Sequence, residues 1–116
     1  MLALPTGLVA IPKAAAQSQI DGASLYLAKC GGCHSIATNR VGPAHKGVFG
    51  RQAGMVAGYR YSPALKNSGI VWDERALDRW LQDPQQVAKG SRMYVTVPDA
   101  AQRKAIIAYL KSPAAN

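Results

Sequence analysis

Two cysteines and a histidine stand together in the segment Cys30-Gly31-Gly32-Cys33-His34, and the chain contains no other cysteine. C-x-x-C-H is the attachment pattern of c-type haem: both thiols become thioethers to the porphyrin vinyl groups, and the histidine supplies an iron ligand. On a helical turn, this spacing places both sulfurs along one porphyrin edge with the imidazole beneath the metal. The alternatives are a redox dithiol, expected near a βαβ pattern that is absent here, and half of a zinc site, for which only His45 remains. The motif therefore predicts one covalently bound haem c.

A haem iron bound by one histidine either takes a sixth ligand from the protein or keeps an open site, and this choice decides function. Met93 follows Gly90-Ser91-Arg92 in a predicted loop between two helices. A thioether there would stabilise ferrous iron and close the metal to small molecules. Met55, in a predicted surface loop, and His45 are the competing candidates. If Met93 only fills the core, as methionines commonly do, the open site would suit a haem enzyme or a gas sensor.

The chain is strongly basic, with 14 Lys and Arg against 6 Asp and Glu and a formal net charge of +8 over 116 residues. This length suffices for one domain, and the charge predicts acidic partners. No nucleic acid is expected as a partner, because no run of Lys and Arg exceeds two residues and no nucleic-acid-binding motif accompanies them. We expect the basic residues to surround a docking face that includes Lys29, Lys46, Lys89 and Arg92.

Three helices are predicted, each beginning at a polar capping residue. The first opens with the capping box Ser18-x-x-Asp21 and carries Gly22 within it, where a glycine permits a close helix crossing. The second spans 73–83 and the third 99–113, each with an apolar stripe at helical spacing. Residues 31–61 are rich in glycine and lack periodicity, so they are predicted to form loops around the haem. The predicted fold class is all-α.

Residues 1–16 differ from the rest of the chain. They are mostly apolar and are interrupted by Pro5-Thr6-Gly7. They end in Ala14-Ala15-Ala16, which resembles the small-residue site at which signal peptides are cleaved. We predict a signal peptide or an N-terminal arm over 1–16 and a single domain over 17–116. The apolar stretch is too short and too interrupted to span a bilayer. Haem attachment to C-x-x-C-H normally takes place outside the cytoplasm, which agrees with export to the periplasm or to the equivalent intermembrane space.

Seven further segments follow the pentapeptide in a specific order and spacing. They are Gly42-Pro43, Gly47-Val48-Phe49-Gly50-Arg51, Gly58-Tyr59-Arg60-Tyr61-Ser62, Gly69-Ile70-Val71-Trp72, Leu81-Gln82-Asp83-Pro84, Gly90-Ser91-Arg92-Met93 and Ile107-Ala108-Tyr109-Leu110. With them, residues 18–112 resemble the class I c-type cytochromes, close to mitochondrial cytochrome c and bacterial cytochrome c2. The resemblance implies the cytochrome c fold, with three main helices and loops wrapped around one covalent haem.

The resemblance also implies a role for each site residue. Cys30 and Cys33 would hold the haem, and His34 and Met93 would be the proximal and distal iron ligands. The carbonyl of Pro43 would accept the proton on the second nitrogen of His34, orienting the imidazole. The residues expected around a buried haem propionate are Arg51, Tyr61 and Trp72, because a buried carboxylate needs a cation and hydrogen-bond donors.

Four positions depart from the family pattern. Leu65 replaces an asparagine and Trp80 a tyrosine, so we expect fewer polar groups beside Met93. His45 replaces an apolar residue that packs on the haem, and Lys89 replaces a proline, which is expected to loosen the segment carrying Met93.

The predicted function is that of a soluble, monomeric electron carrier with one His/Met-ligated haem and no catalytic residues. Expected partners are an oxidase, a quinol-oxidising complex, a photosynthetic reaction centre or a dehydrogenase. One alternative is an electron-accepting subunit of a periplasmic dehydrogenase, and another is the open-site haem enzyme or sensor.

Overall fold

A computed structural model describes residue 7 and residues 21–116. The predicted leader over 1–16, except for Gly7, and the capping residue Ser18 therefore lie outside the described residues. The helices are α2 (Gly22–Lys29), α3 (Pro63–Lys66), α4 (Glu74–Gln82), α5 (Pro84–Val87) and α6 (Ala100–Lys111), followed by the 3-10 turn η1 (Pro113–Ala115). Over these residues no β-strand forms, and one isolated bridge joins Gln52 to Val71. The all-α prediction is confirmed, and α3 and α5 are short helices that the sequence pattern did not predict.

The helices begin where short polar side chains can accept hydrogen bonds from free backbone amides. Asp73 Oδ1 accepts from the amide of Ala76 at 2.8 Å, and Asp99 Oδ1 accepts from Gln102 at 2.9 Å, as the sequence predicted. The first helix differs from its prediction. Asp21 is its N-cap, accepting from the amide of Ala23 at 3.1 Å, rather than the last residue of a capping box. Gly22 is consequently the first residue of α2 and does not lie in its middle.

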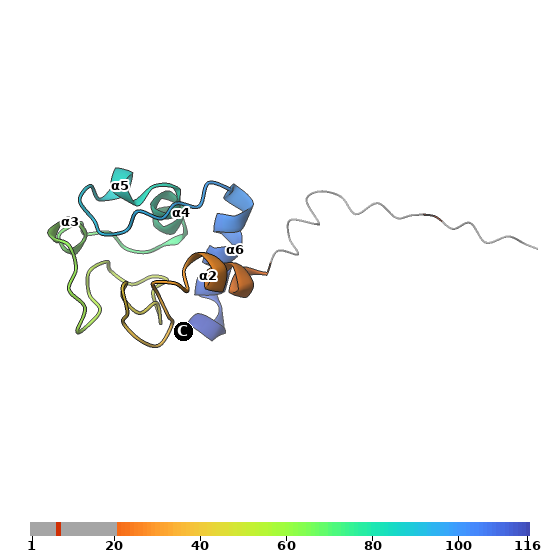
Figure 1. Cartoon of the computed structure of the whole chain (residues 1–116), viewed down its shortest axis with the longest axis horizontal. Coiled ribbons are helices and arrows are strands. Elements are labelled where there is room, and N and C mark those ends of the chain that lie inside the picture. Colours follow the sequence, from red (N-terminus) through yellow and green to blue (C-terminus); the bar gives the residue numbers. More distant parts are fainter. Residues whose placement is uncertain (1–6, 8–20) are drawn as a thin grey trace, which may run out of the picture.

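The two terminal helices of the described part, α2 and α6, cross at one side of the fold (Figure 1). A Cβ built on Gly22 would collide with the carbonyl oxygen of Ala105 and lie 3.1 Å from Cβ of Tyr109. Only glycine therefore permits this approach, which confirms the predicted close crossing. The crossing buries Tyr26 of α2 and leaves Ile106 of α6 fully inaccessible to solvent.

Helix α4 buries one apolar face and is linked to α6 by an ion pair. Leu77, Trp80 and Leu81 are buried at helical spacing. The guanidinium of Arg103, only 8% exposed, donates from Nε to Asp78 at 2.8 Å and from Nη1 to the carbonyl of Val97 at 3.0 Å. A buried cation is stable only when paired and hydrogen-bonded, so Arg103 fixes α4, α6 and the loop before α6 together.

The loops between α2 and α3 curve around the remaining side of the fold (Figure 1). No helix occurs over 31–61, as predicted. Within the described residues, no helix has the length and apolar character needed to cross a membrane.

Candidate haem site

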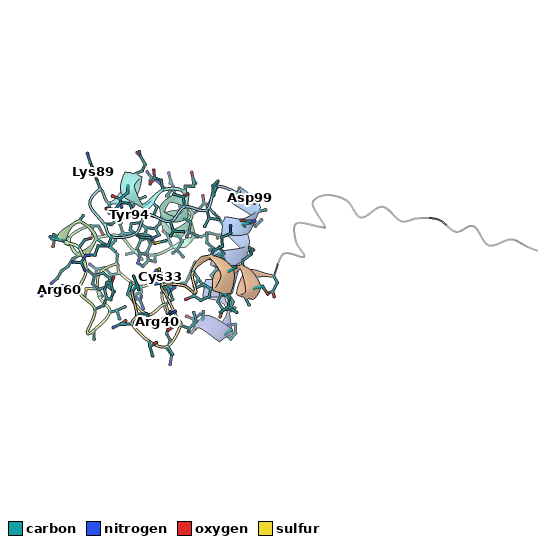
Figure 2. All side chains as sticks on the ribbon, in the orientation of Figure 1. Cys33, Arg40, Arg60, Lys89, Tyr94 and Asp99 are labelled. Carbon is teal, nitrogen blue, oxygen red and sulfur yellow. The ribbon has the colours of Figure 1, made fainter. Side chains whose placement is uncertain are left out.

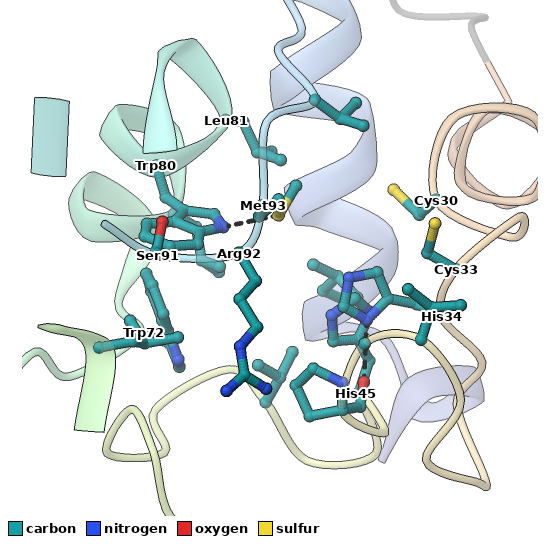
Figure 3. Close-up of a pocket in the computed structure, with 18 of the residues that line it drawn as sticks. Cys30, Cys33, His34, His45, Trp72, Trp80, Leu81, Ser91, Arg92 and Met93 are labelled. Carbon is teal, nitrogen blue, oxygen red and sulfur yellow. Dashed lines mark hydrogen bonds between the residues drawn. The ribbon is translucent and has the colours of Figure 1, made fainter. Parts of the chain in front are cut away.

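One pocket runs through the middle of the fold, between α4, α6 and the loops. Figure 3 shows the thiols of Cys30 and Cys33 at one side and Met93 with Trp80 at another. Every predicted site residue lines this pocket. They are Cys30, Cys33, His34, Pro43, Arg51, Tyr61, Trp72 and Met93. Most of the other lining residues are apolar, among them Val48, Leu77 and Leu81. Val41, Tyr94 and Val95 also line it but remain exposed, so they form its rim.

The C-x-x-C-H motif forms a turn directly after α2. Cys30 is the C-cap of the helix, and its carbonyl accepts from the amides of Cys33 at 3.1 Å and His34 at 2.8 Å. This turn directs both thiols into the pocket, and neither forms a disulfide. Burial, together with the neighbouring Cys33, raises the pKa of the Cys30 thiol to about 11. A redox dithiol instead needs a thiol with a lowered pKa, so the raised pKa of Cys30 disfavours that alternative.

His34 is held with one nitrogen available. Its Nδ1 lies 2.9 Å from the carbonyl oxygen of Pro43, as predicted. A carbonyl only accepts, so Nδ1 carries the proton and Nε2 is left as the ligating atom. Burial lowers the pKa of His34, which also favours the neutral imidazole that binds metal. Gly42 approaches the ring so closely that no side chain fits between them: a Cβ there would lie 2.5 Å from Nδ1.

Arg40 stabilises the motif from outside the pocket, and the sequence analysis did not identify it. Its guanidinium donates to the carbonyls of Gly31 at 2.6 Å, His34 at 3.2 Å and Gly32 at 3.3 Å. These carbonyls belong to the turn that carries both thiols and the imidazole. An exposed arginine in a loop has no sequence signal that would distinguish this role from an ordinary surface charge.

His45 lies on the same side of the pocket as His34. The two rings are stacked, with centroids 3.9 Å apart and planes 20° from parallel. Two imidazoles stacked side by side could not hold a metal between them, so this position does not support the bis-histidine alternative. The Tyr26 hydroxyl and His45 Nδ1 form a hydrogen bond of 2.9 Å, and burial raises the pKa of Tyr26. Burial also lowers the pKa of His45 to about 3, which keeps its imidazole neutral.

Met93 meets a polar partner that the sequence analysis did not expect. The indole N–H of Trp80 donates to Met93 Sδ at 3.1 Å (Figure 3). The expectation that replacing tyrosine by Trp80 removes a polar group beside the methionine is therefore wrong, since indole N–H is itself a donor. Met55, the competing methionine, does not line the pocket and is 63% exposed.

Arg51 and Tyr61 from the connection between α2 and α3, and Trp72 from the loop after α3, all line the pocket. The Arg51 guanidinium donates to the carbonyls of Lys46 at 2.8 Å and Ala44 at 3.1 Å. The hydroxyl of Tyr61 accepts from the amide of Val56 at 3.1 Å, and Trp72 packs edge-on against Trp80 at 5.2 Å. Their role around a propionate stays a prediction.

The donor set and the pocket fit a covalent haem c. Two adjacent thiols point into an apolar pocket, and an imidazole with a free Nε2 lies beside them. A bound haem c would supply reversible one-electron chemistry, while the chain supplies ligands, orientation and an apolar environment.

Comparisons with known proteins agree with this geometry. The family model described as cytochrome c matches residues 19–113. Cytochrome c2 of Blastochloris viridis is 39% identical over 105 residues, covering 87% of this chain and 82% of that protein. Cytochrome c of Euglena viridis is 39% identical over 94 residues, covering 78% and 92%. The solved structure of cytochrome cH from Methylobacterium extorquens is 42% identical, with a TM-score of 0.74 and coverage of 78% of this chain and 93% of that one. The chain therefore belongs to the cytochrome c family and, with its one C-x-x-C-H motif, is an electron carrier that holds a single covalent haem c.

Proposed function

We propose that this carrier binds its iron between His34 and Met93 and passes one electron at a time without changing ligands. One observation supports this most directly: Met93 Sδ and Trp80 face the pocket from a different element and a different side than His34 and the thiols (Figure 3). A protein ligand on each side leaves no coordination site for a substrate, so no residue has a catalytic role. Ligands from the protein on both sides favour a carrier over the open-site enzyme or sensor.

The chain holds each proposed ligand through a hydrogen bond, at the second ring nitrogen of His34 and at the ligating sulfur of Met93 itself. The carbonyl of Pro43 fixes His34 Nδ1, and the indole of Trp80 fixes Met93 Sδ. Ligands held in this way move little when the charge at the metal changes. A small rearrangement keeps electron transfer fast, and the surrounding apolar side chains keep water from the metal.

The experiment that tests the ligand assignment compares Met93→Ala with Met55→Ala. Met93→Ala is expected to lose the sulfur-to-iron charge-transfer absorption of the ferric protein and to bind added imidazole or cyanide readily. Met55→Ala is the matched control, because its side chain is exposed and outside the pocket. A band that survives in Met93→Ala, or is absent from the wild type, would contradict ligation by Met93.

The proposed partners are redox proteins with an acidic docking surface, such as an oxidase, a quinol-oxidising complex, a reaction centre or a dehydrogenase. Four of the six acidic side chains cap helices, and a fifth, Asp78, pairs with Arg103. Most of the acidic side chains therefore already have a hydrogen-bond or ion-pair partner within the chain. Lys29 and Arg92 line the pocket near its exposed rim. Figure 2 shows Lys89 and Arg60 projecting at the end of the fold opposite Asp99.

Salt dependence tests this docking surface. Steering by such charges can raise association rates by roughly 10- to 1,000-fold at low ionic strength, and charges more than about 8 Å apart are screened at physiological salt. Electron delivery to an acidic partner, followed by stopped-flow absorbance, should therefore slow steeply as salt rises. A rate that does not change with salt would contradict the proposed docking surface.

The proposed location is outside the cytoplasm, in the periplasm or its equivalent, with residues 1–16 as a leader and 17–116 as the mature, monomeric domain. Haem attachment through two thioethers supports this location. The intact mass and sedimentation of the protein purified from its native compartment test these points, and a mature chain that retains residues 1–16 would contradict cleavage.

A further inference from the structure

The segment that carries Met93 has little backbone support of its own. At one end the amide of Ser91 donates to Ala88 at 3.0 Å, and at the other the amide of Val97 donates to Leu81 at 2.7 Å. Among the described residues, no backbone amide over 92–96 donates to a backbone carbonyl. The position of Met93 must therefore be set largely by side chains.

Gln85 supplies this support through both ends of its amide group. Its Nε2 donates to the carbonyl of Ser91 at 2.8 Å, to Ser91 Oγ at 3.1 Å and to the carbonyl of Met93 at 2.9 Å. Its Oε1 accepts from the amide of Gly90 at 3.0 Å. The orientation of the amide is fixed by its partners, because two carbonyls need a donor and an N–H needs an acceptor. One side chain thus contacts three of the four residues from Gly90 to Met93.

Gln85 is itself presented from a rigid position. It is the second residue of α5, and its backbone amide donates to the capping carboxylate of Asp83 at 3.0 Å. The preceding Pro84 and the contacted Ser91 are almost completely buried, at less than 2% exposure. Gln85 therefore links the segment to a turn that cannot easily move with it.

We propose that Gln85 is a positioning residue for Met93. It holds Met93 at the pocket by hydrogen bonds to the main chain of Met93 itself and of Ser91 and Gly90. This inference rests on the proposed function, in which Met93 ligates the iron. Trp80 fixes the side-chain end of Met93, at Sδ, and Gln85 fixes the main-chain end. Lys89 was expected to loosen this segment, and the Gln85 contacts compensate for the absent proline.

The discriminating variants are Gln85→Ala, Gln85→Glu and matched changes at Gln86. Gln85→Glu keeps the size of the side chain and an acceptor for Gly90, but it removes the donors and places a carboxylate against carbonyl oxygens. Gln86→Ala and Gln86→Glu control for helix propensity and charge, since Gln86 is the exposed neighbour in α5. A residue that only fills space would tolerate Gln85→Glu, whereas a positioning residue would not.

The first measurement is displacement of Met93 by added imidazole in the ferric holoprotein, followed by loss of the sulfur-to-iron band. One hydrogen bond corresponds to roughly a two- to tenfold change in an equilibrium constant, and Gln85 makes several. We therefore expect imidazole to bind about tenfold more tightly, or more, in both Gln85 variants and to bind with unchanged affinity in both Gln86 variants. Equal affinities in the Gln85 and Gln86 variants would overturn the proposal.

The second measurement does not depend on the iron ligand. Hydrogen exchange at the Gly90 amide should accelerate about tenfold in Gln85→Ala and stay unchanged in Gln86→Ala, because that amide donates to Gln85. An unchanged exchange rate of the Gly90 amide in Gln85→Ala would refute the positioning role of Gln85, even if Met93 ligates the iron. A wild type without the sulfur-to-iron band would instead refute the ligand assignment, and the exchange experiment would still decide whether Gln85 holds the segment.

Discussion

Gly42→Ala provides a sharp test of how the fold holds the imidazole of His34. A Cβ on Gly42 would lie 2.5 Å from Nδ1 and 2.6 Å from Nε2 of His34, which is closer than non-bonded atoms approach. Gly42 has little freedom to withdraw, because its amide donates to Cys33 at 2.9 Å and its carbonyl accepts from Arg40 at 2.9 Å. The ring must therefore rotate or shift, and the bond from Nδ1 to Pro43 is the contact that breaks.

The expected cost follows from these two effects. Inserting a methyl group into filled space costs about 1–3 kcal/mol, and losing the hydrogen bond to Pro43 costs about 0.5–1.5 kcal/mol. We therefore expect the free energy of unfolding of the holoprotein to fall by about 2–4 kcal/mol in guanidinium titrations. The hyperfine-shifted proton resonances of His34 should also move, since they report the orientation of the ring. Gly32→Ala is the control, because a Cβ there meets no atom within 4 Å. If Gly42→Ala is as stable as Gly32→Ala and keeps the wild-type resonances, the steric argument is wrong.

Two further predictions concern Trp80 and His45. Trp80→Phe removes the hydrogen-bond donor to Met93 Sδ. Without that bond the sulfur donates more electron density, which stabilises ferric iron, so the reduction potential should fall. We expect a fall of a few tens of millivolts, because a tenfold change in the equilibrium constant of a one-electron couple corresponds to about 59 mV. Spectroelectrochemistry measures it, and an unchanged or higher potential would contradict this role. His45 has a folded-state pKa of about 3, below its ordinary 6.5, so its contribution to stability is complete above pH 6.5 and is lost as pH falls from 6.5 towards 3. Between pH 6 and 4, the free energy of unfolding should therefore depend less steeply on pH in His45→Leu than in the wild type, by up to about 1.4 kcal/mol per pH unit. Equal slopes in the two proteins would contradict the burial of a neutral His45.

The thiols and the two proposed iron ligands are each restrained by a further contact. Pro43 and Gly42 restrain His34, Arg40 restrains the turn that carries the thiols, and Trp80 restrains Met93. Such restraints suit a protein whose task is to change the charge of its cofactor while changing little else.

Much of this protein follows from its sequence alone. The C-x-x-C-H turn fixes the cofactor because its chemistry needs only residues that are adjacent in the chain. The helices beginning after Asp73 and Asp99 are equally local, since a capping side chain bonds amides two or three residues away.

Tertiary structure decided the contacts between residues that are distant in sequence. The stacking of His45 on His34, the hold of Arg40 on the motif and the bond from Trp80 to Met93 all depend on how separate loops and helices meet. The prediction for Trp80 was wrong because a residue type shows that a donor exists, but not where the fold directs it. The role proposed for Gln85 could not be predicted for the same reason. A polar residue in a short helix can bind the segment that carries Met93 only because the chain returns past it eight residues later.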